Sequence, residues 1–263
     1  MKLDLAQMVT LASYGNANLT KQYISLDLNH STTHSCKKIS FIELISKGET
    51  SEEILIANTP NEWFEYLKES NVKNLKLHFP PTGGDRFSAS LVGGGGRWII
   101  EAFKEQLSDI WDVRWNVNPF EGKERIWTVT YGLTSKNYNQ PKIEYPPLEY
   151  WHKELMIEIK KIKKFAEKHS LVQYVDIFQD ALDCMLSGDP LSLITHNDII
   201  PPENYDLKAK QIFAACNNAW IVAMVDWNEL EFKGKIQKEY NKLSDDLYLK
   251  ICRAIMVATN SFL

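Results

Sequence analysis

The chain has 263 residues, of which 44% are hydrophobic and 24% charged, a globular mixture that excludes an intrinsically disordered chain. Its formal net charge is −4, from 30 basic and 34 acidic residues, and neither half has the basic excess that binding to a phosphate backbone usually requires. No stretch approaches the roughly eighteen uncharged apolar residues of a membrane-spanning helix, so we expect neither nucleic acid nor a membrane as a partner.

Cysteine usage and the N-terminal segment indicate a compartment. The four cysteines are widely scattered and include no C-x-x-C pair, which is typical of reduced thiols. The N-terminal segment has no apolar run long enough for a signal peptide and contains Asp4. We therefore expect a cytoplasmic protein. Its many Trp, Tyr and Phe residues suit either an aromatic core or an interface with another protein.

The N-terminal half is expected to combine strands with a few helices. Apolar positions at helical spacing predict helices at residues 3–13, 60–70 and 97–107. The first should end near Gly15-Asn16, and the second should begin with Thr59 as N-cap and Pro60 at the first helical position. Glu121-Gly122-Lys123 predicts a hairpin between the last two strands. Strands are predicted at residues 23–28, 39–45, 54–57, 72–79, 87–92, 112–118 and 125–133.

A proline-containing connection, residues 135–148, separates this half from a helical one. Beyond it, apolar stripes predict helices at residues 151–166, 171–185, 207–224 and 236–258. The fold class predicted is α+β, with an N-terminal mixed or antiparallel sheet and two or three helices in residues 1–144. An all-helical, bundle-like part follows in residues 145–263, either as a second domain or packed on the sheet as one unit.

Four consecutive glycines, Gly93, Gly94, Gly95 and Gly96, are the most unusual feature of the chain. A strand, a glycine-rich turn and a helix N-terminus can bind phosphate through backbone N–H groups, and Arg97 could supply a cation. The dinucleotide pattern fails because Trp98 stands where its last glycine belongs, and no G-K-[ST] of a phosphate-binding loop follows. The alternative, which we favour, is a packed corner that leaves no room for a Cβ.

The preceding loop, P-P-T-G-G-D-R-F, supplies further candidate ligand-binding residues. Asp85 and Arg86 lie at its end and His78 before it, so that a base, a carboxylate and an anion clamp could meet near the glycines. No spacing here defines a catalytic triad, and an Asp-Arg pair in a turn is also a common structural feature. Both interpretations stay open.

Two other segments are weaker candidates. His30, His34 and Cys36 have the spacing of zinc ligands but no identifiable fourth ligand, and a polar loop explains them equally well, so no metal or cofactor is predicted. The second segment lies in the C-terminal half and comprises Asn217, Asn218, Asp226, Trp227 and Asn228. These residues could bind a ligand or a basic partner. Alternatively, they fix the register of the helices and cap a helix end.

Standard catalytic signatures, such as G-x-S-x-G and H-E-x-x-H, are missing from the sequence. We therefore expect a non-catalytic cytoplasmic binding protein that recognises another protein, such as an inhibitor or an immunity-type protein. The alternative is an enzyme or sensor that binds a small anionic ligand at the loop of residues 80–97.

Overall fold

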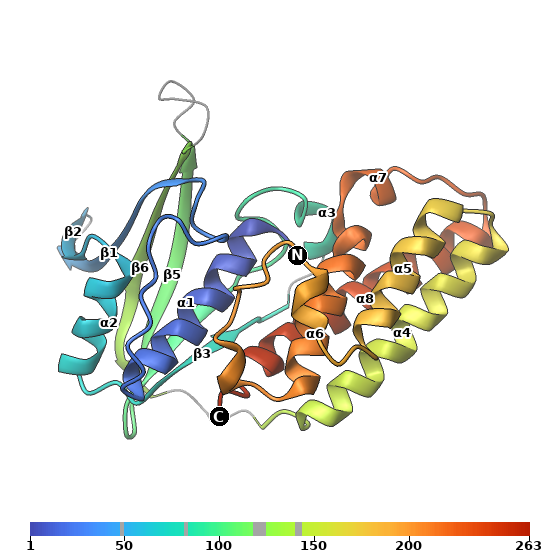
Figure 1. The fold of residues 1–263 in the computed structure, drawn as a ribbon. Helices are drawn as coiled ribbons and strands as arrows, with labels where there is room; N and C mark the ends of the chain where they lie inside the picture. Colours follow the sequence, from blue (N-terminus) through green and yellow to red (C-terminus); the bar gives the residue numbers. More distant parts are fainter. Residues whose placement is uncertain (48–49, 82–83, 118–124, 140–143) are drawn as a thin grey trace.

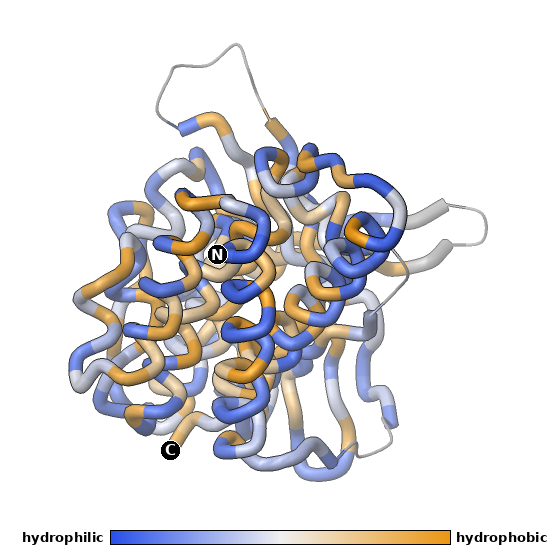
Figure 2. The backbone as a smooth tube through the Cα atoms, turned by 90° about the vertical axis from the view of Figure 1, so that its right-hand side faces the viewer, coloured by the Kyte–Doolittle hydropathy of each residue, from blue (hydrophilic) through white to orange (hydrophobic). Residues whose placement is uncertain are grey.

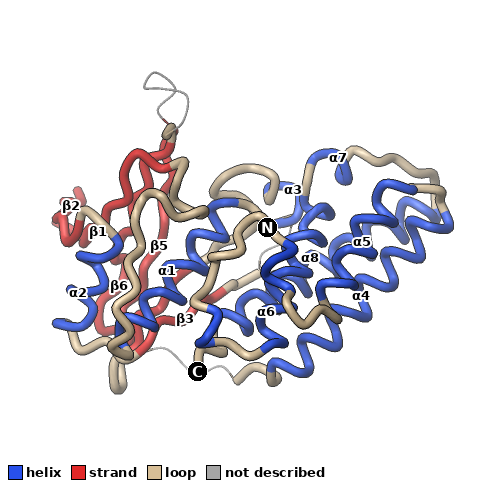
Figure 3. The backbone as a smooth tube through the Cα atoms, viewed as in Figure 1, coloured by secondary structure: helices blue, strands red, loops and turns tan. Residues whose placement is uncertain are grey.

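A computed structural model describes residues 1–47, 50–81, 84–117, 125–139 and 144–263 of the chain. Six strands form one mixed sheet in the order β2-β1-β6-β5-β4-β3, and the long helices of the C-terminal half lie beside it (Figures 1 and 3). The predicted α+β class is confirmed. The strands are β1 (Cys36–Lys47), β2 (Thr50–Ala57), β3 (Asn74–His78), β4 (Ile99–Phe103), β5 (Ser108–Val117) and β6 (Trp127–Tyr138).

One pair of neighbouring strands, β1 and β6, is parallel, and the other described pairs are antiparallel. The expected pairing of β5 with β6 is confirmed, with Val113 opposite Tyr131. The predicted turn residues Glu121-Gly122-Lys123 lie outside the described residues. Strand β6 continues to Tyr138, into the segment that the sequence indicated as a connection.

Helix α1 (Leu3–Leu19) lies between the sheet and the C-terminal helices and is buried along most of its length (Figure 3). The prediction that it ends near Gly15-Asn16 is wrong, because both residues serve packing. A Cβ on Gly15 would lie 2.4 Å from Leu75 Cδ1, so glycine allows α1 to approach β3 closely. The carboxamide of Asn16 pairs with the backbone of Leu75, accepting from its N–H at 2.6 Å and donating to its C=O at 2.9 Å.

Helix α2 (Pro60–Glu69) begins where the sequence predicts. Thr59 Oγ1 accepts a hydrogen bond from the Glu62 N–H, and Pro60 occupies the first helical position. The helix covers the same face of the sheet as α1 by inserting Trp63 against Phe41, with stacked rings 4.6 Å apart. This aromatic contact belongs to the core, as a Trp-rich sequence allows.

The C-terminal half consists of α4 (Leu148–Lys168), α5 (Val172–Cys184), α6 (Leu207–Ala219) and α8 (Lys235–Thr259), with short helical turns between them. Hydrophobic and hydrophilic residues alternate along the backbone of the helices (Figure 2). Helix α6 packs against α4, α5 and α8. Helix α6 ends at Ala219, earlier than predicted, and η3 (Trp220–Ala223) and α7 (Val225–Asn228) follow it. No described helix is long and apolar enough to cross a bilayer.

Both halves contribute to one cluster of buried hydrophobic residues. Tyr205 Oη donates to Ser13 Oγ at 2.7 Å, which joins the helical half to α1. The carboxamide of Asn260, after α8, pairs with both backbone groups of Leu77. Asn16 and Asn260 therefore satisfy β3, which would otherwise be an open sheet edge.

Three local predictions around the glycine run and before β1 are wrong. Residues 23–28 form no strand. Residues 87–92 were expected as a strand, but α3 (Asp85–Ser88) and a series of turns occupy this region. Residues 97–107 were expected as a helix, but Ile99–Phe103 pair with both β3 and β5 as β4. Here tertiary pairing overrides a short apolar pattern that fits either structure.

Candidate functional site

The glycine run closes a tight corner between α3 and β4. Gly93, Gly95 and Gly96 have φ of 77°, 81° and 87°, a conformation that residues with a Cβ rarely adopt. A Cβ on Gly94 would lie 2.0 Å from the carbonyl oxygen of Ser88. On Gly96 it would lie 2.6 Å from Phe79 Cε2. Conformation and close packing therefore both require glycine here.

The amides of this corner have partners within the protein. Gly93 N donates to Asp4 Oδ2 at 2.7 Å, Gly94 N to Leu91 O at 2.9 Å, and Gly95 N to Ser88 Oγ at 3.0 Å. The Gly95 carbonyl in turn accepts from Tyr248 Oη at 2.6 Å. These three N–H groups are thus occupied and do not form an open cradle for an anion.

A buried ion pair that the sequence did not reveal holds the corner to α1. Lys2 Nζ lies 3.0 Å from Asp4 Oδ2 and donates to the carbonyls of Gly94 and Leu91 at 2.6 and 3.0 Å. Both side chains are largely buried. No sequence motif signals that Lys2 contacts residues as far along the chain as Leu91 and Gly94. The charges fix the path of the loop by making hydrogen bonds to backbone groups that a turn leaves unpaired.

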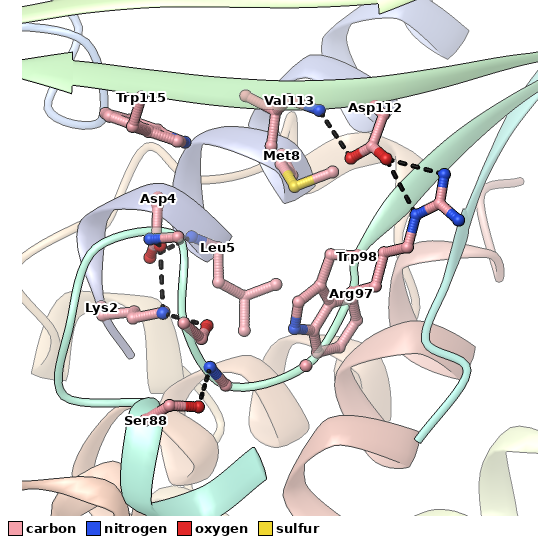
Figure 4. Close-up of a pocket in the computed structure, with 14 residues that line it drawn as sticks. Lys2, Asp4, Leu5, Met8, Ser88, Arg97, Trp98, Asp112, Val113 and Trp115 are labelled. Atoms are coloured by element: carbon pink, nitrogen blue, oxygen red, sulfur yellow. Dashed lines mark hydrogen bonds and ion pairs between the residues drawn. The ribbon is translucent and has the colours of Figure 1, made fainter. Parts of the chain in front are cut away.

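A cavity of about 330 Å³ lies between this corner, the start of α1 and β5 (Figure 4). Figure 4 shows Leu5, Met8 and Trp98 around one space, with Arg97 extending to Asp112 at its edge. The cavity is lined by Lys2, Asp4, Leu5, Met8, Ser88, Gly93, Gly94, Gly95, Gly96, Arg97, Trp98, Asp112, Val113 and Trp115.

Arg86 does not reach this cavity, although the sequence suggested that it could act as an anion clamp near the glycines. Its guanidinium is buried, donates from Nε to Asp245 Oδ1 at 2.6 Å and from Nη1 to Asn228 Oδ1, and lies over the Phe87 ring. It lines a separate cavity of about 370 Å³ together with Asp85 and Asp245. Arg86 therefore ties α3 to α7 and α8, and joins two candidate segments that the sequence left apart.

His78 lies apart from both cavities, at the end of β3. Its Nε2 donates to Glu101 Oε2 at 2.6 Å, and Ser108 Oγ donates to Glu101 Oε1 at 2.5 Å. Burial alone would raise the pKa of Glu101, but these hydrogen bonds and the nearby imidazole hold it below its usual value. The three side chains form an internal polar chain on the sheet.

The candidates of the helical half take different positions. Asn217 accepts from the main-chain nitrogen of Met1 with both its carbonyl and its Oδ1, and Asn218 Nδ2 contacts Cys184 Sγ at 3.6 Å. Both asparagines line a cavity of about 360 Å³. Trp227 is buried and donates to Ser244 Oγ at 2.9 Å, whereas Asp226 is exposed.

The zinc-like spacing does not bring its residues together. Cys36 is buried with Gln7 Nε2 at 3.3 Å, and this burial raises the pKa of its thiol to about 11. His30 contacts Asp198 instead, in a polar cluster with Ser31 that the sequence did not indicate. Within the described ranges, no group of three or more His, Cys, Asp or Glu residues could hold a metal ion.

Comparison with protein-family models, curated proteins and solved structures finds no match to the chain.

Large apolar side chains lie exposed on the outside of the same corner. Leu91 is 65% and Phe87 57% exposed, and Val92, Met224 and Val225 are also exposed. We call these five residues the loop surface. These residues lie on two neighbouring segments, α3 with the loop after it and the start of α7. Helix α3 contacts η3, which precedes α7. Lys2 binds the Leu91 carbonyl and lines one cavity together with Met224. Figure 1 shows α3 between this loop and α7.

Proposed function

We propose that the protein is a cytoplasmic, non-catalytic binding protein that docks another protein on the loop surface. The observation that carries this proposal is the exposure of five large apolar side chains on two neighbouring segments. Burying one such side chain in an interface contributes roughly 1.5–3 kcal/mol. Clustered exposed apolar residues on a folded chain are typical of interaction sites.

The rigid support behind the loop surface favours protein recognition. The Lys2–Asp4 pair and the occupied glycine amides fix one segment, and Arg86 connects it to the other. A surface held in place before binding loses little conformational entropy when a partner docks. Inhibitors commonly present such pre-organised loops to their targets, which supports an inhibitor or immunity-type role.

Charge beside the loop surface indicates the chemistry of the partner. Asp226 and Glu229 are exposed next to Met224 and Val225. A partner with an apolar centre and a basic rim would complement this arrangement, and its association should slow at high salt.

The cysteines support the cytoplasmic part of the proposal. All four are free and buried. Unpaired thiols are usual in a reducing compartment, whereas secreted proteins more often use disulfides.

Site-specific photo-crosslinking in the native host tests the docking surface. A benzoylphenylalanine placed at Phe87 or at Leu91 should form an adduct with one host protein. The matched control is Leu55 on β2, which is similarly exposed but lies at the far edge of the sheet (Figure 1). Leu91→Asp should weaken binding of the purified partner by about tenfold or more, and Leu55→Asp should not.

Three results would contradict the proposal. One is the absence of an adduct from both Phe87 and Leu91, and another is the same adduct from Leu55. The third is an adduct with a second copy of this chain, which would make the loop surface a contact between copies.

A further inference from the structure

We infer that the cavity of about 330 Å³ beneath the glycine corner is a binding site for a small aromatic carboxylate. The ligand would have a flat apolar ring system and one carboxyl group. This site lies under the loop, whereas the loop surface lies outside it, so the inference is independent of the docking function. The volume is at the lower end of the range typical of small-molecule pockets.

The apolar walls of the cavity favour a ligand with a flat ring. Leu5 and Met8 of α1 face the indole of Trp98 across the cavity, and Val113 of β5 adds another apolar side chain (Figure 4). A flat ring can pack against the indole while aliphatic side chains contact its other face. Met8 can adapt to different ring shapes because its side chain is unbranched and flexible.

Two buried donors in the wall lack acceptors. The Nε1–H groups of Trp98 and Trp115 have no hydrogen-bond partner among the described residues, and of the six indoles in this state only these two line the cavity. Trp98 is only 6% exposed, and Figure 4 shows its nitrogen on the side of the ring that faces Leu5. An unpaired buried N–H is unfavourable, and a ligand oxygen would satisfy it. Both nitrogens are shielded, so a side chain of the cavity wall must shift for the oxygen to reach them.

The charge of the ligand follows from which cation remains accessible. Lys2 Nζ is already bound to Asp4 and two carbonyls, and the amides of Gly93 to Gly95 are occupied. Arg97 is 58% exposed at the edge of the cavity and pairs through Nε and Nη2 with one oxygen of Asp112. Its Nη1 makes no hydrogen bond within the described part of the chain. Its positive charge at the edge of the cavity can attract a ligand whose carboxylate oxygens accept from the indole N–H groups.

NMR of the indole N–H groups tests the site, because the chain has eight Trp residues. The probes are naphthoate and its uncharged analogue naphthylmethanol. Naphthoate should shift two indole resonances saturably, those that disappear in Trp98→Phe and in Trp115→Phe, and leave the others in place. Arg97→Gln should weaken naphthoate binding about tenfold and leave naphthylmethanol binding unchanged.

The matched control is Arg114→Gln, since Arg114 is 55% exposed and pairs with Glu53 elsewhere on the sheet. It should leave naphthoate binding intact, and the thermal midpoints of all variants show whether they fold. The inference is wrong if naphthoate shifts none of the indole resonances or all of them. Equal affinity for the two probes, or equal losses in Arg97→Gln and Arg114→Gln, would remove the carboxylate from the proposal.

Discussion

Three glycine-to-alanine substitutions can separate conformational strain from close packing at the corner. Gly94→Ala places a Cβ 2.0 Å from the Ser88 carbonyl oxygen and 2.8 Å from its carbon, both backbone atoms that cannot rotate away. Gly93→Ala meets nothing within 4 Å, but its φ is 77°. Gly188→Ala meets nothing within 4 Å and has no positive φ, so it is the control.

The expected magnitudes follow from these contacts. Gly188→Ala should change the free energy of unfolding by less than about 0.5 kcal/mol or stabilise slightly, because alanine restricts the unfolded chain. Gly93→Ala should destabilise by about 1–2 kcal/mol through its left-handed conformation. Gly94→Ala should destabilise by about 3–5 kcal/mol. Overpacking contributes roughly 1–3 kcal/mol of this. Loss of the neighbouring hydrogen bonds of Gly93 and Gly95 contributes about 1 kcal/mol each.

Urea unfolding followed by Trp fluorescence measures the three free energies. The urea midpoint should be highest for Gly188→Ala, lower for Gly93→Ala and lowest for Gly94→Ala. An adaptable loop could move to accommodate a Cβ at position 94. If Gly94→Ala is no less stable than Gly93→Ala, the corner is not tightly packed, and the pre-organised loop surface loses its physical basis.

Other substitutions test the contacts around the corner. Arg86→Met should lower stability by about 2–4 kcal/mol because it leaves the buried Val222 carbonyl and the half-buried Asn228 carboxamide without this donor. Replacing the exposed Arg114 by Met should lower stability by less than about 1 kcal/mol, and thermal unfolding compares the two variants. Asn260→Ala should open the β3 edge and increase light scattering on concentration, and unchanged scattering would show that the edge needs no cover. The pKa of Glu101 is lower in the folded protein than its ordinary value of 4.5, so the ionised carboxylate stabilises the fold at pH above 4.5. This stabilisation is lost as the pH falls through the folded-state pKa. Glu101→Gln should therefore make the urea midpoint fall less steeply as the pH is lowered. An unchanged slope would show that the pairing of Glu101 with His78 does not cause the loss of stability in acid.

Local signals in the sequence predicted the long helices α1, α2, α4, α5, α6 and α8, although the helix expected at residues 97–107 does not form. Thr59 and Pro60 mark the start of α2 because capping depends on residues within one turn. The apolar stripes of the C-terminal half predict α4, α5, α6 and α8, since a stripe at helical spacing states which face is buried. Ends were less accurate: α1 continues past Asn16, whose side chain pairs with β3, and α6 ends at Ala219, before the predicted end.

The region from Asp85 to Phe103 shows what a local pattern cannot give. A strand of five residues such as β4 is too short for its apolar spacing to distinguish strand from helix. Its state is decided by β3 and β5, which pair with it on both sides. Site contacts are harder still, because Lys2 binds Gly94 across 92 positions and Arg86 binds Asn228 across 142. The sequence singled out Arg86 and Asn228 separately, and only the fold joins them.

The two binding proposals use different groups on the same support, so each can fail alone. Docking depends on apolar side chains outside the corner, such as Leu91, which an aspartate would disrupt without altering the cavity beneath. The carboxylate site depends on Arg97 and on the indole of Trp98, which are not part of the loop surface. Lys2 is part of that shared support, because its Nζ binds the Leu91 carbonyl and its side chain also lines the cavity. A ligand that packs against Leu5 and Trp98 would further restrict the loop that carries Leu91, and restricting a docking loop before contact lowers the entropy lost on binding.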